Sequence, residues 1–141
     1  MVRLLTLPFL VVPDASGDPL AEFSYYPADD MMYVRWFGHL TAEEVIRVSK
    51  ADMTQRTTLP YRRVLNDKSQ TTGDWQEALP WLQYEWLPNA ARSGVEAMSY
   101  VVSADVAQQL ASRQFVAQVR HLLAVEMFYD LTEAHRWLLT K

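Results

Sequence analysis

The sequence of 141 residues contains no cysteine and only four glycines. Without cysteine it can form no disulfide, thiolate metal site, iron–sulfur cluster or thiol nucleophile. The glycines are spread along the chain and match neither a G-x-G-x-x-G nor a Walker pattern, so no local phosphate-binding loop is encoded. We therefore predict a protein without a cofactor.

Histidine is also scarce, with three residues at His39, His121 and His135. None belongs to an HxH or HExxH pattern or to a local carboxylate cluster at ligand spacing, so no metal site is predicted. No G-x-S-x-G is present, and a lone carboxylate without a partner acid or base does not make an active site. The sequence thus predicts no catalytic residues and no enzyme. A weaker alternative is a hydrolase or transferase that pairs Asp67 with a distant histidine.

Long apolar runs are missing as well. No run approaches the ~18 residues needed to cross a bilayer, and the formal net charge of −4 disfavours nucleic acid, which normally requires a basic face. We expect neither a membrane nor a nucleic acid as partner, and we expect a cytoplasmic location.

The N-terminal stretch MVRLLTLPFLVV allows two interpretations. It is either a strand that includes Leu4–Thr6 and Val11–Val12 or a processed signal peptide.

Apolar residues make up 50% of the chain and aromatic residues 12%, which is typical of a folded domain with a sizeable core. We predict a single domain over residues 1–141, in which residues 1–20 form an N-terminal extension or edge strand.

Two β-rich stretches, Ala21–Tyr26 and Met31–Phe37, are joined by the short PADD connection and indicate an antiparallel hairpin. In the second stretch Met32, Val34 and Trp36 fall on one side of the strand.

Beyond residue 40, four helical segments alternate with strands at Tyr61–Asp67, Val95–Val102 and Val125–Tyr129. Thr41 and Glu44 form a capping box at the first helix. This order predicts an α/β fold, a mixed and mostly parallel sheet with superhelical βα crossovers and an N-terminal antiparallel hairpin.

The same pattern predicts which residues are buried. Val95–Val102 is the most apolar strand and is expected at the centre. The apolar face expected for the first helix consists of Ala42, Val45, Ile46, Ser49 and Met53. The expected core includes Trp36, Trp86, Val101 and Phe128.

Three groups of residues carry a family resemblance. They are Trp36-Phe37-Gly38-His39-Leu40-Thr41, then Trp81, Glu85-Trp86-Leu87-Pro88 and Gly94, and finally Phe128, Asp130-Leu131, Glu133-Ala134 and Trp137-Leu138. Together they resemble the small STAS-like proteins of bacteria, which are often grouped with the lipid-binding CRAL-TRIO fold and are mostly of unknown function. The similarity covers about residues 21–139. It implies a β/α superhelical sheet and a non-catalytic role, as in anti-sigma-factor antagonists. The D-S-S-G type phosphorylation motif of those antagonists is absent from the matching segment, Asn66–Asp74.

The candidate binding site follows the third expected strand, because ligands of open α/β sheets gather outside the carboxyl ends of the strands. Asp67 is expected to end this strand, and the following loop offers Ser69, Thr71 and Thr72. Asp74 opens the next helix, where free amides could bind an anion. The alternative is that Asp67 and Asp74 merely cap those amides.

The stretch GDWQEALPWLQYEWLP, residues 73–88, is unusually rich in aromatic residues. Helical spacing places Leu82, Trp86 and Ala90 on one stripe, which we expect to face the sheet. The second stripe consists of Trp81, Tyr84 and Pro88. It is covered by the chain itself, forms a homodimer interface or contacts a small amphiphilic ligand, because exposed aromatic patches are typical of such surfaces. The predicted partner is a second copy of the chain.

These observations favour a non-enzymatic protein-interaction or regulatory module, with an unidentified protein partner as a further possibility. The alternative is a carrier or sensor of a small hydrophobic or amphiphilic ligand. It rests on the richness in aromatic residues and on the CRAL-TRIO connection.

Overall fold

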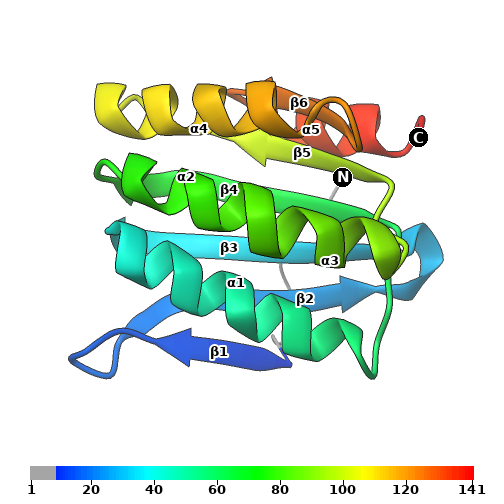
Figure 1. Ribbon diagram of the computed structural model, residues 1–141, viewed down its shortest axis with the longest axis horizontal. Coiled ribbons are helices and arrows are strands. Elements are labelled where there is room, and N and C mark those ends of the chain that lie inside the picture. Colours follow the sequence, from blue (N-terminus) through cyan, green and yellow to red (C-terminus); the bar gives the residue numbers. More distant parts are fainter. Residues whose placement is uncertain (1–8) are drawn as a thin grey trace.

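Six strands form one mixed sheet within residues 9–141, the part of the chain that this computed structural model describes. They are β1 (Leu10–Pro13), β2 (Pro19–Tyr26), β3 (Met31–His39), β4 (Arg63–Thr72), β5 (Ala97–Val101) and β6 (Ala124–Phe128). The strands lie side by side in their order along the chain (Figure 1). The predicted α/β class is confirmed. The expected strand at Leu4–Thr6 and the signal-peptide alternative lie outside the described residues.

The sheet changes from antiparallel to parallel at β3. Strands β1, β2 and β3 pair antiparallel, whereas β3, β4, β5 and β6 pair parallel. The predicted hairpin is therefore confirmed. Val11 and Val12 belong to β1, which lies at one edge of the sheet.

Helices cover both faces of the sheet. The helical segments are η1 (Pro27–Asp29), α1 (Ala42–Arg56), η2 (Gln76–Ala78), α2 (Leu79–Trp81), η3 (Leu82–Trp86), α3 (Leu87–Arg92), α4 (Val106–Val119) and α5 (Leu131–Leu138). Figure 1 shows α1, the α2–α3 segment and α4 side by side in front of the sheet, with α5 behind it. The buried apolar residues accordingly form two clusters, a large one under α1 to α4 and a smaller one under α5.

Helix α1 begins at the predicted capping box, in which the Thr41 hydroxyl accepts a hydrogen bond from the Glu44 amide at 3.2 Å. Its buried face differs from the prediction, because Ala42, Ile46 and Met53 are only partly buried. The residues that face the interior are Val45, Val48, Ser49, Asp52 and Arg56. Hydrophobic periodicity missed the last two because they are charged.

The aromatic segment packs as predicted. Leu82, Trp86 and Ala90 are buried against the sheet, and Trp75 is fully buried as well. Between Pro80 and Pro88 the chain widens into the π-helical turn η3. A proline has no amide to donate to the turn before it, so a widened turn at this place fits the sequence.

Three expectations about the strands are wrong. Val95–Val102 yields the fully buried strand β5, yet β5 is the fifth of six strands because β3 and β4 form the middle of the sheet. Phe128 is only partly buried, because β6 lies at the edge of the sheet. Strand β4 does not end at Asp67 but continues to Thr72, so Ser69, Thr71 and Thr72 lie in a strand and not in a loop.

Replacement of Trp86 by alanine should lower the free energy of unfolding by about 3–5 kcal/mol, because it empties the space that the buried indole fills between η3 and the sheet. Chemical denaturation followed by circular dichroism measures this change. The matched control is Tyr84→Ala in the same turn, where the side chain is 72% exposed and the change should stay within about 0.5 kcal/mol. Equal losses in the two variants would contradict the observed orientation of this segment.

Candidate functional site

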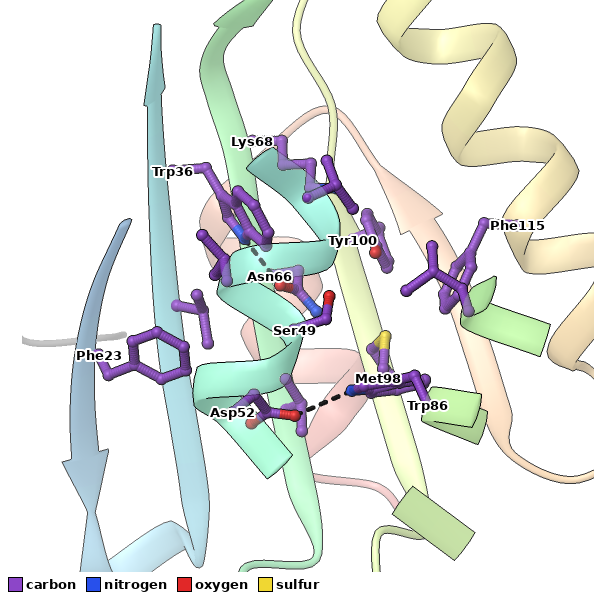
Figure 2. Close-up of a pocket in the computed structure, with 15 residues that line it drawn as sticks. Phe23, Trp36, Ser49, Asp52, Asn66, Lys68, Trp86, Met98, Tyr100 and Phe115 are labelled. Atoms are coloured by element: carbon purple, nitrogen blue, oxygen red, sulfur yellow. Dashed lines mark hydrogen bonds between the residues drawn. The ribbon is translucent and has the colours of Figure 1, made fainter. Parts of the chain in front are cut away.

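A small cavity lies between the sheet and the helices in front of it. Its volume is ≈ 30 Å³, which leaves room for about two or three water molecules. Strands β2 to β5 form its floor, and α1, η3 and α4 form its roof. The lining residues are Phe23, Val34, Trp36, Val45, Val48, Ser49, Asp52, Val64, Asn66, Lys68, Leu82, Trp86, Met98, Tyr100 and Phe115. The lining is thus largely apolar and aromatic, with a few polar groups among these side chains (Figure 2).

Lys68 reaches the cavity from an irregular part of β4. Opposite the two steps from Arg35 to Phe37 in β3, strand β4 advances three residues, from Asp67 to Gln70. Such a β-bulge inserts an extra residue and re-aims nearby side chains, and bulges are frequent beside functional sites. Asn66 and Lys68 line the cavity, whereas Asp67 between them contacts Tyr33 of the cluster under α5.

The Lys68 side chain is completely buried among aromatic rings. Its Nζ lies 3.8 Å from the ring centre of Trp75, 4.4 Å from that of Trp36 and 5.0 Å from that of Tyr100. It has no hydrogen-bond partner among the described residues. A buried amine without a partner is costly, so this arrangement indicates a group that is kept for a purpose other than stability.

Burial lowers the pKa of Lys68 well below its ordinary value, because the ammonium form would lose its hydration. Aromatic faces attract cations and offset part of this loss. Desolvation nevertheless determines the direction of the shift, since no described carboxylate contacts the amine. The site therefore favours the neutral amine.

Figure 2 shows Lys68 beside Trp36 and Tyr100 at one end of the cavity and Asp52 beside Trp86 at the other. Near the first end the Trp36 indole donates a hydrogen bond to the Asn66 side-chain oxygen at 2.9 Å. This bond fixes the amide orientation of Asn66 on the cavity floor.

At the second end the Asp52 carboxylate holds several elements together. It accepts hydrogen bonds from the Trp86 indole at 3.0 Å, from the Tyr61 hydroxyl and from the Arg56 guanidinium. Arg56 also donates to the Ser93 hydroxyl at 2.9 Å and to the Asn89 side-chain oxygen at 2.6 Å. Burial, and then the nearby Asp52 charge, raise the pKa of Tyr61. The Trp86, Tyr61 and Arg56 donors all make hydrogen bonds within the cluster, so this cluster has a structural role.

Of the residues predicted as a binding site, the structure brings Asp67 and Ser69 into contact, whereas Thr71, Thr72 and Asp74 have separate partners. The Asp67 carboxylate accepts hydrogen bonds from the Tyr33 hydroxyl at 2.6 Å and from the Ser69 amide and hydroxyl at 3.0 and 2.6 Å. Tyr33 belongs to the cluster under α5, so this group lies on the opposite face of the sheet from the cavity. Burial, followed by the hydrogen bond to Asp67, raises the pKa of Tyr33.

Thr71, Thr72 and Asp74 each have a separate local partner. The Thr71 hydroxyl is buried and donates to the Lys68 carbonyl at 2.8 Å, while the Thr72 hydroxyl lies 3.0 Å from the His39 ring. Asp74 accepts a hydrogen bond from the Gln76 amide at 2.9 Å. These contacts agree with the alternative of local capping, and ligand binding by these residues stays a prediction.

The backbone amide that follows β4 is hydrogen-bonded to an acidic side chain. The Gly73 amide donates to the Asp105 carboxylate at 3.0 Å, and Asp105 also caps α4. Gly73 has a φ of +106°, and a Cβ there would lie 2.4 Å from the Leu40 carbonyl oxygen, so glycine is required at this crossing. The amide that directly precedes Asp74 is thus bound within the chain.

Residues 9–141 contain neither a metal-binding cluster nor a membrane-spanning helix. Within that range, no three or more histidines and carboxylates are grouped as they would be around a metal ion. His135 is buried and lies 3.0 Å from the Asp29 carboxylate, as a pair rather than a larger cluster. Nor does any helix in that range have the length and apolar character of a membrane span.

Sequence reasoning missed Lys68 and Asp52 as interior residues. The sequence pattern predicts a loop at Lys68, because the bulge breaks the alternation of β4. Asp52 is not among the residues of the apolar face predicted for α1. One signal was present in the sequence: Asp52 and Arg56 are spaced at i and i+4, which suits an ion pair on one helix face.

No protein-family model matches the chain, and no curated protein matches it significantly. Among solved structures, it is similar to an uncharacterized protein from the DUF3478 family with a SpoIIAA-like fold from Shewanella loihica PV-4. The TM-score is 0.57 at 18% sequence identity, over 84% of this chain and 91% of that chain. The similarity shows the fold, and it confirms the STAS-like resemblance at that level.

Replacement of Lys68 by methionine should raise the free energy of unfolding at pH 7 by about 1–3 kcal/mol, because it removes a buried amine that no described residue pairs. The pKa of Lys68 is lowered in the folded state, so the unfolded chain binds the extra proton. The wild type should therefore gain stability relative to the variant as pH rises toward ~10.4, by at most about 1.4 kcal/mol per unit. Urea denaturation across that range measures the difference, with exposed Lys50→Met as control. If the difference in free energy of unfolding between the wild type and Lys68→Met does not change with pH, the pKa of Lys68 is not lowered in the folded state.

Proposed function

We propose that this protein is a non-enzymatic module that binds a small amphiphilic ligand in the cavity between its sheet and helices, as a sensor or carrier. The observation that carries the proposal is the Lys68 amine, which has no hydrogen-bond partner within residues 9–141 and lies in the wall of a cavity that is otherwise mostly apolar and aromatic. Ligand sites typically combine an apolar lining with a few polar groups that fix orientation.

The composition of the wall defines the ligand. Phe23, Val34 and Met98 offer apolar contact, while Lys68 and Ser49 offer hydrogen-bonding groups. A cavity of ≈ 30 Å³ accepts a molecule of few heavy atoms unless the helices above it move apart. The ligand is therefore small, mostly apolar and equipped with one hydrogen-bond acceptor for the amine.

The origin of the wall residues supports a sensing role. Ser49 belongs to α1, Trp86 to η3 and Phe115 to α4, so a ligand in the cavity would contact each helix in front of the sheet. Closely packed interiors transmit small displacements, and occupancy would thus alter the outer surface of these helices. A regulatory readout of this kind agrees with the fold.

The proposal of a non-enzymatic protein is supported by the hydrogen bonds of Asp52, the carboxylate that lines the cavity. Asp52 is bound by Arg56, Tyr61 and Trp86, which leaves it engaged rather than available as a general base.

Titration of the protein with 1-propanol should quench or shift tryptophan fluorescence in a saturable manner, because Trp36 and Trp86 line the cavity. Val48→Leu adds a methylene to the wall and should weaken this binding by at least about tenfold, equivalent to about 1.4 kcal/mol. The control is Val119→Leu, an equally buried core position that does not line the cavity. A response that persists unchanged in Val48→Leu would place the ligand elsewhere. Native mass spectrometry of the purified protein would reveal a larger co-purified amphiphile.

A second candidate function is self-association through the outer side of the α2–α3 segment. Tyr84 is 72% exposed there, whereas Trp81 is partly buried against the core, with the Lys50 ammonium 5.8 Å from its ring centre. Trp81, Tyr84 and Pro88 would then form the core of a two-fold interface, since one patch serves both copies. Tyr84 is the member whose replacement leaves the interior intact.

Light scattering of the wild type at high micromolar concentration should give the mass of a dimer. Tyr84→Glu should shift the mass to that of a monomer with unchanged circular dichroism, because a charge in the interface is costly to bury. The control Glu85→Gln changes an exposed neighbour and should leave the dimer intact. A monomeric wild type would rule this candidate out.

A further inference from the structure

We propose that the Lys68 amine forms a reversible imine with a small uncharged aldehyde that enters the cavity. This inference rests on the proposed function, because it uses the same cavity and names the class of its ligand. It adds a covalent bond between ligand and protein, which neither the fold nor the cavity alone implies.

The geometry supplies what an imine-forming lysine requires. The amine lines the cavity, is fully buried and has no hydrogen-bond partner among the described residues. Ring centres of Trp75, Trp36 and Tyr100 lie within 5.0 Å of Nζ, so the nitrogen is shielded from bulk water. A lysine desolvated in a hydrophobic pocket is activated as a nucleophile, because its neutral form carries a free electron pair.

The lysines of this chain differ sharply in their surroundings. The sequence has three of them, Lys50, Lys68 and Lys141. Lys50 and Lys141 are exposed, whereas Lys68 is buried. The molecule therefore contains two exposed reference amines against which the reactivity of Lys68 can be measured.

The reaction needs no oxidant, reductant or cofactor. The nitrogen electron pair attacks the carbonyl carbon to form a C–N bond, and the C=O π electrons move to oxygen. Both amine protons are transferred to that oxygen, the C–O bond breaks and water leaves, so that a C=N bond remains. Burial raises the pKa of Tyr100, and its protonated hydroxyl is suited to hydrogen bond to the carbonyl oxygen. Addition of water reverses each step and releases the aldehyde.

Cavity size and charge select the aldehyde. The volume of ≈ 30 Å³ holds two or three water-sized groups, so it suits a carbonyl compound of about three heavy atoms, or of four with a small outward shift of the wall. An anionic carbonyl compound would bring a further charge into an apolar interior, which is costly without a partner. Acetaldehyde and propionaldehyde therefore fit, and larger or charged carbonyl compounds do not.

The folded protein is treated at pH 7 with millimolar propionaldehyde and cyanoborohydride, which reduces an imine to a stable propylamine. Peptide mapping by mass spectrometry separates Lys68 from Lys50, Lys141 and the amino terminus. Lys68 should be labelled at least about tenfold faster than either exposed lysine, since each unit of lowered pKa increases the neutral fraction up to about tenfold. Slower labelling at Lys68, or none, would overturn the proposal.

Two variants and one ligand analogue test whether the cavity and the imine cause the fast labelling of Lys68. Val48→Leu should slow labelling of Lys68 and leave Lys50 and Lys141 unchanged, whereas equal slowing at all three would count against the cavity. Lys68→Met should remove the fast phase. 1-Propanol has as many heavy atoms as propionaldehyde but cannot form an imine. If 1-propanol binds in the cavity and Lys68 is not labelled, the imine is wrong and the proposed function stands. If neither reagent acts at the cavity, both proposals fail.

Discussion

The Asp52 carboxylate is the interaction on which the front of the molecule depends. Held by Arg56 on the next turn of α1, it binds the Trp86 indole of η3 and the Tyr61 hydroxyl that precedes β4. Arg56 extends the network to Asn89 and Ser93, at the end of α3. A buried ion pair of this kind adds little net stability, but loss of one partner leaves an uncompensated charge. The network therefore fixes how α1 and the aromatic segment sit on the sheet.

Because the network holds α1 and the aromatic segment in place, the cavity beneath them can contain the polar Lys68 side chain, although this lowers the stability of the fold. Apolar packing alone would close the space under α1, as in most domain cores. Instead Lys68 occupies the wall without a hydrogen-bond partner among the described residues, beside an Asn66 amide oriented by Trp36. Natural proteins accept such losses of stability mainly at functional sites. The cavity and its amine are thus better understood as a site than as imperfect packing.

Much of the fold was predictable because it depends on local periodicity and chain order. The hairpin, the capping box at Thr41 and the buried stripe of Leu82, Trp86 and Ala90 each follow from spacing within one element. The candidate site was not predictable in the same way. Asp67 was expected at a strand end, yet β4 runs on to Thr72, and the bulge that prolongs it depends on pairing with β3. Pairing of distant strands leaves no local pattern in the sequence.

The sequence by itself determined the α/β class, the order of the elements and the absence of thiol chemistry, since composition and alternation are properties of the chain. Only the tertiary structure decided which polar residues are inside. Lys68 and Asp67 are adjacent in the sequence, but successive side chains of a strand point to opposite faces of the sheet. Asp67 accordingly meets Tyr33 on one face, while Lys68 enters the aromatic cavity on the other. Burial is set by what packs above each face, and that is decided by helices distant in the sequence.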